Sequence, residues 1–305
     1  MRIGGVKISH VVEAAGRHAI PFRTTIRAIR RRSRPYEDDP QNSGWCVYQG
    51  LEQIAAVLAS GTRIQGATVL EFGSGWLPLI PTLYHLAGAA HLIMTDIDRL
   101  MDAQTTMRAR RIVGARLPEV AEFLGETVET LEARLATPMV TDYLVPWNAE
   151  NQAANSIDIV FSRATLEHVP PQLLTHFFSH FHRMIRPGGA TVHSVDNSDH
   201  WQHRDRTLSR VNFLRFDDRD LFWRFGQFNP QGYQNRFRHS DYIDMLERAG
   251  FRVDVAWGNP DPQCIRDLQD IPLNKRFQNK TKEDLATLTS LFIARKPGDG
   301  KPAAC

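Results

Sequence analysis

The 305-residue sequence has few cysteines, no long apolar run and little net charge. Its three cysteines, Cys46, Cys264 and Cys305, form no C-x-x-C pair, so neither a disulfide framework nor a thiolate zinc site is expected. No segment approaches the roughly 20 apolar residues of a membrane helix, and the N-terminal residues lack the apolar stretch of a secretory leader. We therefore expect a soluble, cytoplasmic protein with no membrane partner.

A formal net charge of +3 is small for this length and gives no general argument for binding nucleic acid. Basic residues nevertheless gather in two places, at Arg27, Arg30, Arg31, Arg32 and Arg34 and at Arg108, Arg110, Arg111 and Arg116. The first group would suit a phosphate-bearing partner, whereas a solvated helix face is the commoner origin of such a run. The expected partner is a small molecule, and the oligomeric state is left open.

The most informative stretch is Ala67–Pro81, where an apolar run ends at Glu71 and a turn with two glycines follows. Gly73-Ser74-Gly75 allows the chain to turn sharply and the backbone to approach a ligand closely. The third glycine of the G-x-G-x-x-G pattern is replaced by Pro78, which weighs against a nicotinamide-dependent dehydrogenase. The turn therefore predicts a nucleoside site of a different kind.

Apolar runs alternate with helical spacing along the chain, which predicts a doubly wound parallel sheet. The expected strands are Thr68–Phe72, Leu92–Asp96, Val140–Val145, Ile157–Ser162, Ala190–Val195, Phe251–Trp257 and Leu288–Arg295. Helical spacing is predicted over Val47–Ala59, and one amphipathic helix is predicted from Val120 to Leu135.

The chain divides into three parts on this pattern. Residues 1–45 are predicted to be a basic, helical N-terminal extension, residues 46–296 the main α/β domain, and residues 297–305 a flexible tail. Two insertions, at 100–138 and 197–241, interrupt the alternation within the main domain.

Four motifs in order resemble those of class I S-adenosylmethionine-dependent methyltransferases, as found in poorly characterised bacterial proteins. They are the glycine turn after Glu71, the strand end Thr95-Asp96-Ile97, the segment Ser156–Val169 with its Leu-Glu-His-Val ending, and the turn Pro187-Gly188-Gly189. The resemblance implies a Rossmann-like sheet of seven strands, mostly parallel with the last strand antiparallel. It also implies methyl transfer from S-adenosyl-L-methionine.

The resemblance assigns cofactor-binding roles to residues after four of the strands. Glu71, Gly73, Ser74 and Gly75 would hold the methionine part, and Asp96, followed by Ile97, would hold the ribose hydroxyls. Trp147 and Asn148 would contact adenine, although Trp147 also suits a core position. The strand ending at Ser162 and Arg163 would line the floor of the cleft, beside the reacting methyl group.

The insertion at 197–241 follows the fifth strand, so we expect it to cover the acceptor site as a lid. His200, with Asp199 beside it in sequence, is the candidate general base; the alternative is a surface histidine. Trp201, Asn235 and Arg236 are the candidate acceptor-binding residues, and Arg236 could instead pair with Asp217 or Asp218.

No metal site is predicted. His176 and His180 share a helix face, but the neighbouring phenylalanines indicate packing and no third ligand stands nearby. The predicted function is methyl transfer to an oxygen or nitrogen nucleophile of a small acceptor. The alternatives are a non-catalytic cofactor-binding protein and an RNA methyltransferase.

Overall fold

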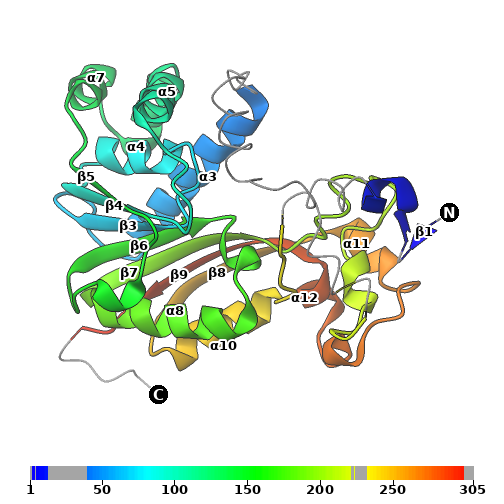
Figure 1. Ribbon diagram of the computed structural model, residues 1–305. Helices are drawn as coiled ribbons and strands as arrows, with labels where there is room; N and C mark the ends of the chain where they lie inside the picture. Colours follow the sequence, from blue (N-terminus) through cyan, green and yellow to red (C-terminus); the bar gives the residue numbers. More distant parts are fainter. Residues whose placement is uncertain (1, 4, 13–39, 221–222, 224–231, 299–305) are drawn as a thin grey trace.

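The computed structural model describes residues 2–3, 5–12, 40–220, 223 and 232–298. Its centre is a seven-stranded sheet with the order β5-β4-β3-β6-β7-β9-β8 (Figure 1). The five strands β3 to β7 are parallel, and β9 runs antiparallel to both of its neighbours, as expected. The strand bounds are β3 Thr68–Phe72, β4 His91–Thr95, β5 Thr141–Leu144, β6 Ile157–Arg163, β7 Ile185–Asp196, β8 Arg252–Pro260 and β9 Thr287–Arg295.

Helices cover both faces of the sheet, so its central strands are apolar on both sides. Val69 packs into a core shared with α3 to α7, whereas its neighbour Leu70 packs on the opposite face with α8 and α10. The helices are α3 Pro40–Ala59, α4 Leu79–Leu86, α5 Ala103–Gly114, α6 Leu117–Leu124, α7 Val128–Ala136, α8 Pro171–Met184, α10 His239–Arg248, α11 Pro262–Asp267 and α12 Lys282–Ala286. Figure 1 shows α3, α4, α5 and α7 above the sheet and α8 and α10 below it.

Two helix predictions differ from the structure. The single helix expected from Val120 to Leu135 is two helices, α6 and α7, because Gly125 takes a left-handed conformation (φ 67°) and ends α6. The helix expected from Val47 begins earlier, at Pro40. Its additional first turns carry Ser43 and Cys46 to the loop that follows β3.

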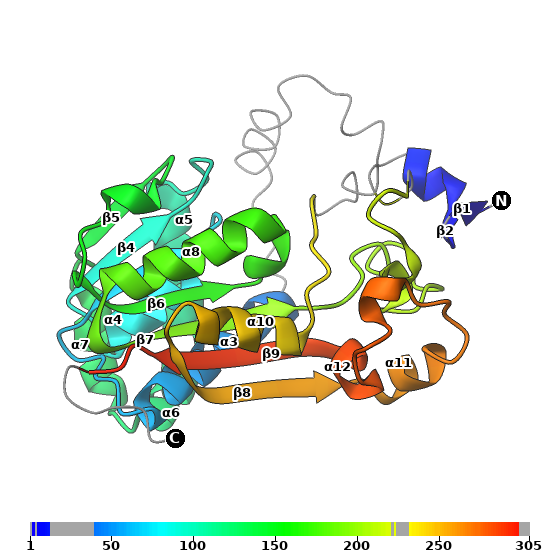
Figure 2. The ribbon, with the colours of Figure 1, turned by 90° about the horizontal axis from the view of Figure 1, so that it is seen from below.

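Two segments build a side lobe, which we define as residues 197–220, after β7, and residues 261–286, which connect β8 to β9. Its core joins Phe213 and Leu214 of the first segment to Leu268, Phe277 and Leu285 of the second. Figure 2 shows α11 and α12 of this lobe beyond one end of β8 and β9. The segment predicted as a lid is thus half of a larger packed unit, and its second half was not anticipated.

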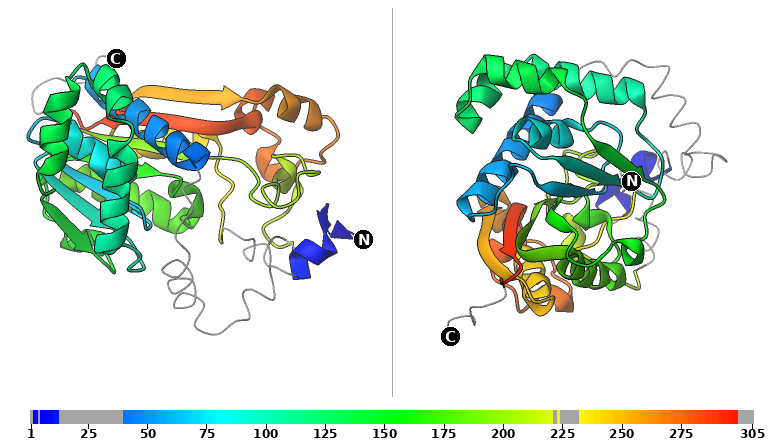
Figure 3. Two further views of the ribbon diagram at one scale, coloured as in Figure 1. Left: turned by 90° about the horizontal axis from the view of Figure 1, so that it is seen from above. Right: turned by 90° about the vertical axis from the view of Figure 1, so that its left-hand side faces the viewer.

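The N-terminal residues lie against this side lobe (Figure 3). The short strands β1 (Arg2–Ile3) and β2 (Val6–Lys7) pair, the Lys7 amide donates to Asp205 Oδ2 at 3.3 Å, and Val6 packs with Trp201 and Leu208. The predicted helical extension and its first arginine group fall largely on residues 13–39, which lie outside the described residues. In the described part of the chain, no helix is both long and apolar enough to cross a membrane.

Candidate functional site

The loop after β3 turns at two glycines with positive φ, 77° at Gly73 and 63° at Gly75. The amides of Gly73 and Ser74 donate to the Thr95 carbonyl at 3.0 and 2.9 Å, which ties the loop to the end of β4. A Cβ on Gly73 would overlap the Thr165 side chain, whereas a Cβ on Gly75 would meet nothing within 4 Å. The first glycine thus permits close packing, and the second leaves the backbone open to a ligand.

Asp96 connects this loop to the start of the next one. Its Oδ2 accepts a hydrogen bond from the Gly75 amide at 2.8 Å, and its Oδ1 accepts one from the Ile97 amide at 2.7 Å. The Ile97 side chain is 83% exposed. The strand-end carboxylate therefore already orders the glycine turn before any ligand binds.

Glu71 is buried beneath the loop, and its Oε2 has no hydrogen-bond partner among the described residues. Burial is the main reason that its pKa rises to about 8, and the hydrogen bond from Ser74 only partly offsets this effect. A buried carboxyl with an unused oxygen is suited to receive a cationic group from a ligand.

These elements enclose a pocket of about 320 Å³. Its walls come from the glycine loop, the first turns of α3, the start of α4 and the end of β6. The lining residues are Asn42, Ser43, Cys46, Glu71, Gly73, Ser74, Gly75, Trp76, Leu77, Leu79, Ile80, Arg163 and Ala164.

Three residues with predicted cofactor contacts have side chains engaged elsewhere. Ser162 Oγ lies 2.7 Å from His193 Nδ1 inside the sheet, and both side chains are fully buried. Trp147 stacks on Phe177, with ring centroids 6.2 Å apart, and Asn148 accepts from the Glu150 amide at 2.9 Å to cap η1 (Ala149–Asn151). Trp147 nevertheless remains near the predicted ribose carboxylate, because its amide donates to the Asp96 carbonyl at 3.1 Å.

A second cleft lies on the other side of Arg163 and Ala164, which line both cavities. Ala164 has a φ of 48°, which is uncommon for a residue with a side chain, and its amide donates to the Ser194 carbonyl at 2.9 Å. Arg163 Nε donates to Gln49 Oε1 at 2.7 Å. The second cleft is lined by Trp45, Gln49, Arg163, Ala164, Ser194, Val195, Asp196, Ser198, Gln202, His203, Arg206, Arg210, Leu288 and Thr289.

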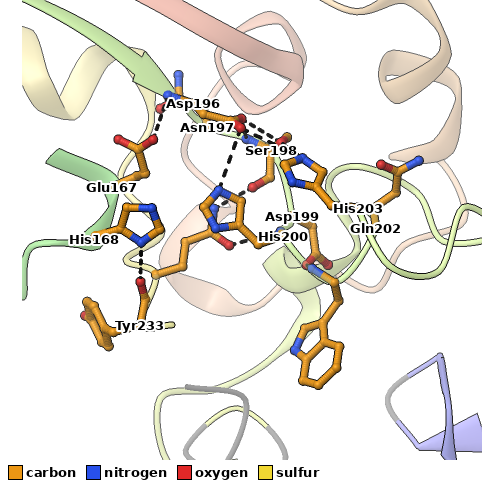
Figure 4. Close-up of polar contacts among 12 residues, drawn as sticks. Glu167, His168, Asp196, Asn197, Ser198, Asp199, His200, Gln202, His203 and Tyr233 are labelled. Carbon is orange, nitrogen blue, oxygen red and sulfur yellow. Dashed lines mark hydrogen bonds and ion pairs between the residues drawn. The ribbon is translucent and has the colours of Figure 1, made fainter. Parts of the chain in front are cut away.

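Asp196, at the end of β7, is the centre of the polar cluster beside this cleft (Figure 4). Its Oδ2 lies 3.7 Å from His200 Nε2 and 3.8 Å from His203 Nε2, and its Oδ1 accepts from Ser198 Oγ at 2.6 Å. Burial alone would raise the pKa of Asp196, but the neighbouring imidazole of His200 and the hydrogen bonds from Ser198 outweigh it and lower the pKa to about 2. The carboxylate therefore stays ionised.

The carboxylate beside the His200 imidazole is therefore that of Asp196 and not that of its sequence neighbour Asp199. Asp199 instead accepts from the Trp201 amide at 2.9 Å. Burial raises the pKa of Asp199 to about 6. His200 itself is only 2% exposed and does not line the cleft, whereas His203 is about one third exposed (32%) and does.

The side chains of the three predicted acceptor-binding residues also contact other parts of the protein. Trp201 lies in the small core with Val6, and Asn235 Nδ2 donates to the carbonyls of Leu166 and Val169 at 2.7 and 3.0 Å. Arg236 donates to the carbonyls of Phe213 and Phe216 and pairs with Asp218. The salt bridge to Asp218, which the sequence analysis kept as the alternative role of Arg236, is therefore formed.

Comparison with known proteins agrees with this architecture. A family model described as "Methyltransferase domain" matches residues 48–255. The chain belongs to this methyltransferase family. It is a class I S-adenosylmethionine-dependent methyltransferase. The open face of Gly75 and the unused oxygen of Glu71 fit a ligand with a cationic amino group.

Solved structures resemble the chain at the level of the fold. An S-adenosylmethionine-dependent methyltransferase from Mesorhizobium loti is 14% identical, with a TM-score of 0.44 over 79% of this chain and 96% of that one. The 1,6-didemethyltoxoflavin-N1-methyltransferase of Burkholderia thailandensis, solved with S-adenosylhomocysteine, is 14% identical, with a TM-score of 0.43 over 82% and 78%. No curated protein matches the sequence.

Proposed function

We propose that this methyltransferase acts on an oxygen or nitrogen nucleophile of a small acceptor bound in the cleft lined by Asp196 and His203. The observation that carries the proposal is the wall shared by two cavities, since Arg163 and Ala164 line both the pocket at the glycine loop and the second cleft. A methyl donor on one side and a nucleophile on the other would meet at these two residues. Alignment of two bound reactants supplies most of the rate enhancement in such a displacement.

The charge of the second cleft favours an anionic acceptor. Arg163, Arg206 and Arg210 line it, and Asp196 is the one carboxylate among its lining residues. Arg210 lies 3.4 Å from Asp261, which offsets part of its charge. Guanidinium groups bind carboxylates and phosphates through paired hydrogen bonds, so we propose an acceptor that carries one of these groups.

The cofactor supplies an electrophilic methyl group when it is bound; the protein's own residues must place the nucleophile and take its proton. We assign the proton-accepting role to His203 in place of His200, because His203 lines the cleft and has Asp196 beside it. Ionised Asp196 would hold the imidazole in orientation and stabilise its protonated form. An amine acceptor that binds unprotonated would need this assistance less.

The test is a transfer assay with cofactor labelled in its methyl group, using a cell extract separated into small-molecule, RNA and protein fractions. The proposal expects label in an anionic small molecule. Transfer to RNA would support the nucleic-acid alternative, and binding without transfer to any fraction would support the non-catalytic alternative.

With the acceptor identified, His203→Gln should reduce kcat about 100-fold, the scale of general-base loss, while the affinity for S-adenosylhomocysteine stays unchanged. The exposed residue His176 provides the control, since it lies on α8 outside both cavities. Equal kcat values for His203→Gln and His176→Gln would remove His203 from the proposal.

A further inference from the structure

A cluster of three potential metal ligands lies behind the second cleft. Glu167 and His168 belong to the turn η2 (Leu166–His168) after β6, and His200 follows β7. One ligand atom from each side chain lies within 4.8 Å of the other two. Figure 4 shows the three side chains beside one another.

Two of these side chains are buried with an unused polar atom. Glu167 and His200 are each 2% exposed, and Glu167 Oε2 and His200 Nδ1 have no hydrogen-bond partner among the described residues. Leaving such atoms unpaired in a protein interior costs about 1–3 kcal/mol each, so native structures rarely do so without a reason. The unpaired atoms indicate that a binding partner belongs between them.

The surroundings of the two histidines are those of metal-bound imidazoles. His168 Nδ1 lies 2.7 Å from the Tyr233 carbonyl, so its proton is on Nδ1 and the lone pair of Nε2 is available. His200 Nε2 faces Asp196 Oδ2, which leaves Nδ1 as the ligating atom. Histidines that bind metals usually donate their second ring N–H to a carbonyl or carboxylate in this way.

We propose that Glu167, His168 and His200 bind a divalent first-row transition-metal ion such as Zn²⁺. Two imidazoles and one carboxylate suit such ions, whereas Mg²⁺ and Ca²⁺ prefer oxygen ligands. Ligands about 2.0–2.2 Å from zinc lie roughly 3.4 Å apart in a tetrahedron, so the side chains need to approach by no more than about 1.5 Å. The sequence analysis considered only His176 and His180 as metal ligands, and His200 stands more than thirty positions after Glu167 and His168 in the chain.

The ion would join the end of β6 to the start of the side lobe. None of its three ligands lines the second cleft, so a stabilising role is the one that we infer. This proposal is independent of the proposed acceptor chemistry, because metal binding is measured without cofactor or acceptor.

The experiment uses the full chain, stripped of metal by a chelator, in a His176→Ala/His180→Ala background. That background removes the other described cluster of suitable residues, Glu150, His176 and His180, of which the glutamate and His176 are exposed. Titration with Zn²⁺ by calorimetry and with Co²⁺ by visible absorption should give one equivalent bound. The thermal midpoint should rise with Zn²⁺.

Glu167→Gln and His200→Gln should each weaken Zn²⁺ binding at least 10-fold and abolish the Co²⁺ absorption bands, with an unchanged circular dichroism spectrum. Unchanged binding in both variants would overturn the proposal. A second result would also overturn it: the unmodified chain binds one equivalent of Zn²⁺ and the His176→Ala/His180→Ala variant binds none. His176 and His180 would then be the metal site. If Glu167→Gln and His200→Gln do not fold, His168→Gln provides the same test, because His168 is the partly exposed ligand of the three.

Discussion

The pocket at the glycine loop and the second cleft are built in different ways. The pocket centres on one contiguous stretch, Glu71 to Gly75, which Asp96 holds through the Gly75 amide, and α3 and the end of β6 add Asn42, Ser43 and Arg163. The cleft combines α3, the ends of β6, β7 and β9, and the first segment of the side lobe. A site made by one local turn is visible in sequence, whereas a site made by distant segments depends on how those segments pack.

The side lobe also determines what two charged residues just before α10 do. Arg236 and Arg238 are among the largest fully buried side chains, at 2% and 1% exposure. Their guanidinium groups donate to backbone carbonyls of the lobe, Arg236 to Phe213 and Arg238 to Asn197 and Leu285. Charged residues that a sequence offers for ligand binding are here used to hold the lobe together, so the cleft takes its charge from Arg163, Arg206 and Arg210 instead.

The largest expected effect is on the pH dependence of stability. It is tested with two buried carboxyl groups, Glu71 at the pocket and Asp199 in the side lobe. The pKa of Glu71 rises from 4.5 to about 8, and that of Asp199 rises from 3.8 to about 6. At a pH between the ordinary pKa and the raised pKa of each group, the folded state keeps a proton that the unfolded state has lost. The free energy of unfolding therefore falls as pH rises through this range. For Glu71 this stabilisation is complete below pH 4.5 and is lost by about pH 8.

Glu71→Gln should therefore flatten the decline in stability by up to ~1.4 kcal/mol per pH unit between about pH 5 and 8. Asp199→Asn should flatten it only in the lower window, below about pH 6. Urea unfolding of the cofactor-free protein at a series of pH values measures both. Parallel profiles for wild type and Glu71→Gln would show that Glu71 ionises normally in the folded state.

The second prediction separates a structural arginine from a cleft arginine. Arg236→Met should cost about 1–3 kcal/mol of folding free energy for each of the Phe213 and Phe216 carbonyls that it leaves unpaired, and loss of the ion pair adds little because Asp218 is exposed. Arg206→Met, at an exposed position in the cleft, should change stability by less than about 0.5 kcal/mol and raise only the acceptor KM. Chemical denaturation checks the first effect and steady-state kinetics the second. Similar stability losses in both variants would remove the distinction.

The third prediction tests the two glycines of the loop against each other. Gly73→Ala should destabilise the protein by about 2–3 kcal/mol, since the new methyl group would overlap Thr165 in addition to straining the positive φ. Gly75→Ala meets no atom within 4 Å and should cost only about 1 kcal/mol. Thermal denaturation of both variants measures the difference. Thr165→Ala in the Gly73→Ala background should recover part of the loss if the overlap is the cause.

The same contrast explains which predictions from sequence succeeded. The sheet and most strand positions could be predicted because strand periodicity and turn residues are local properties, whereas the antiparallel last strand was implied by the resemblance to the family. The choice between the two roles considered for Arg236 and the Asp196–His200 pair could not be predicted, because both depend on contacts between segments that are distant in the sequence or on the direction of a side chain in a turn. One local signal was missed: Asp196 ends a parallel strand as Asp96 does, and carboxylates in that position lie at the ligand edge of the sheet.

The smallest expected effect concerns Asp96, whose role in binding the cofactor ribose remains a prediction. Asp96→Ala should weaken S-adenosylhomocysteine binding by at least ~1.5 kcal/mol, roughly tenfold, the scale of a charge-assisted hydrogen bond. Part of this loss would arise within the protein, because the variant also loses the acceptor for the Gly75 amide. Asp98→Ala is the matched control, since Asp98 is exposed two positions further along the same loop. Calorimetric titration of both variants separates the contributions: an unaltered affinity in Asp96→Ala would mean that the carboxylate neither contacts the ribose nor needs to order the turn. A loss confined to Asp96→Ala would establish that this pocket, unlike the second cleft, depends on a residue that its own local motif identifies.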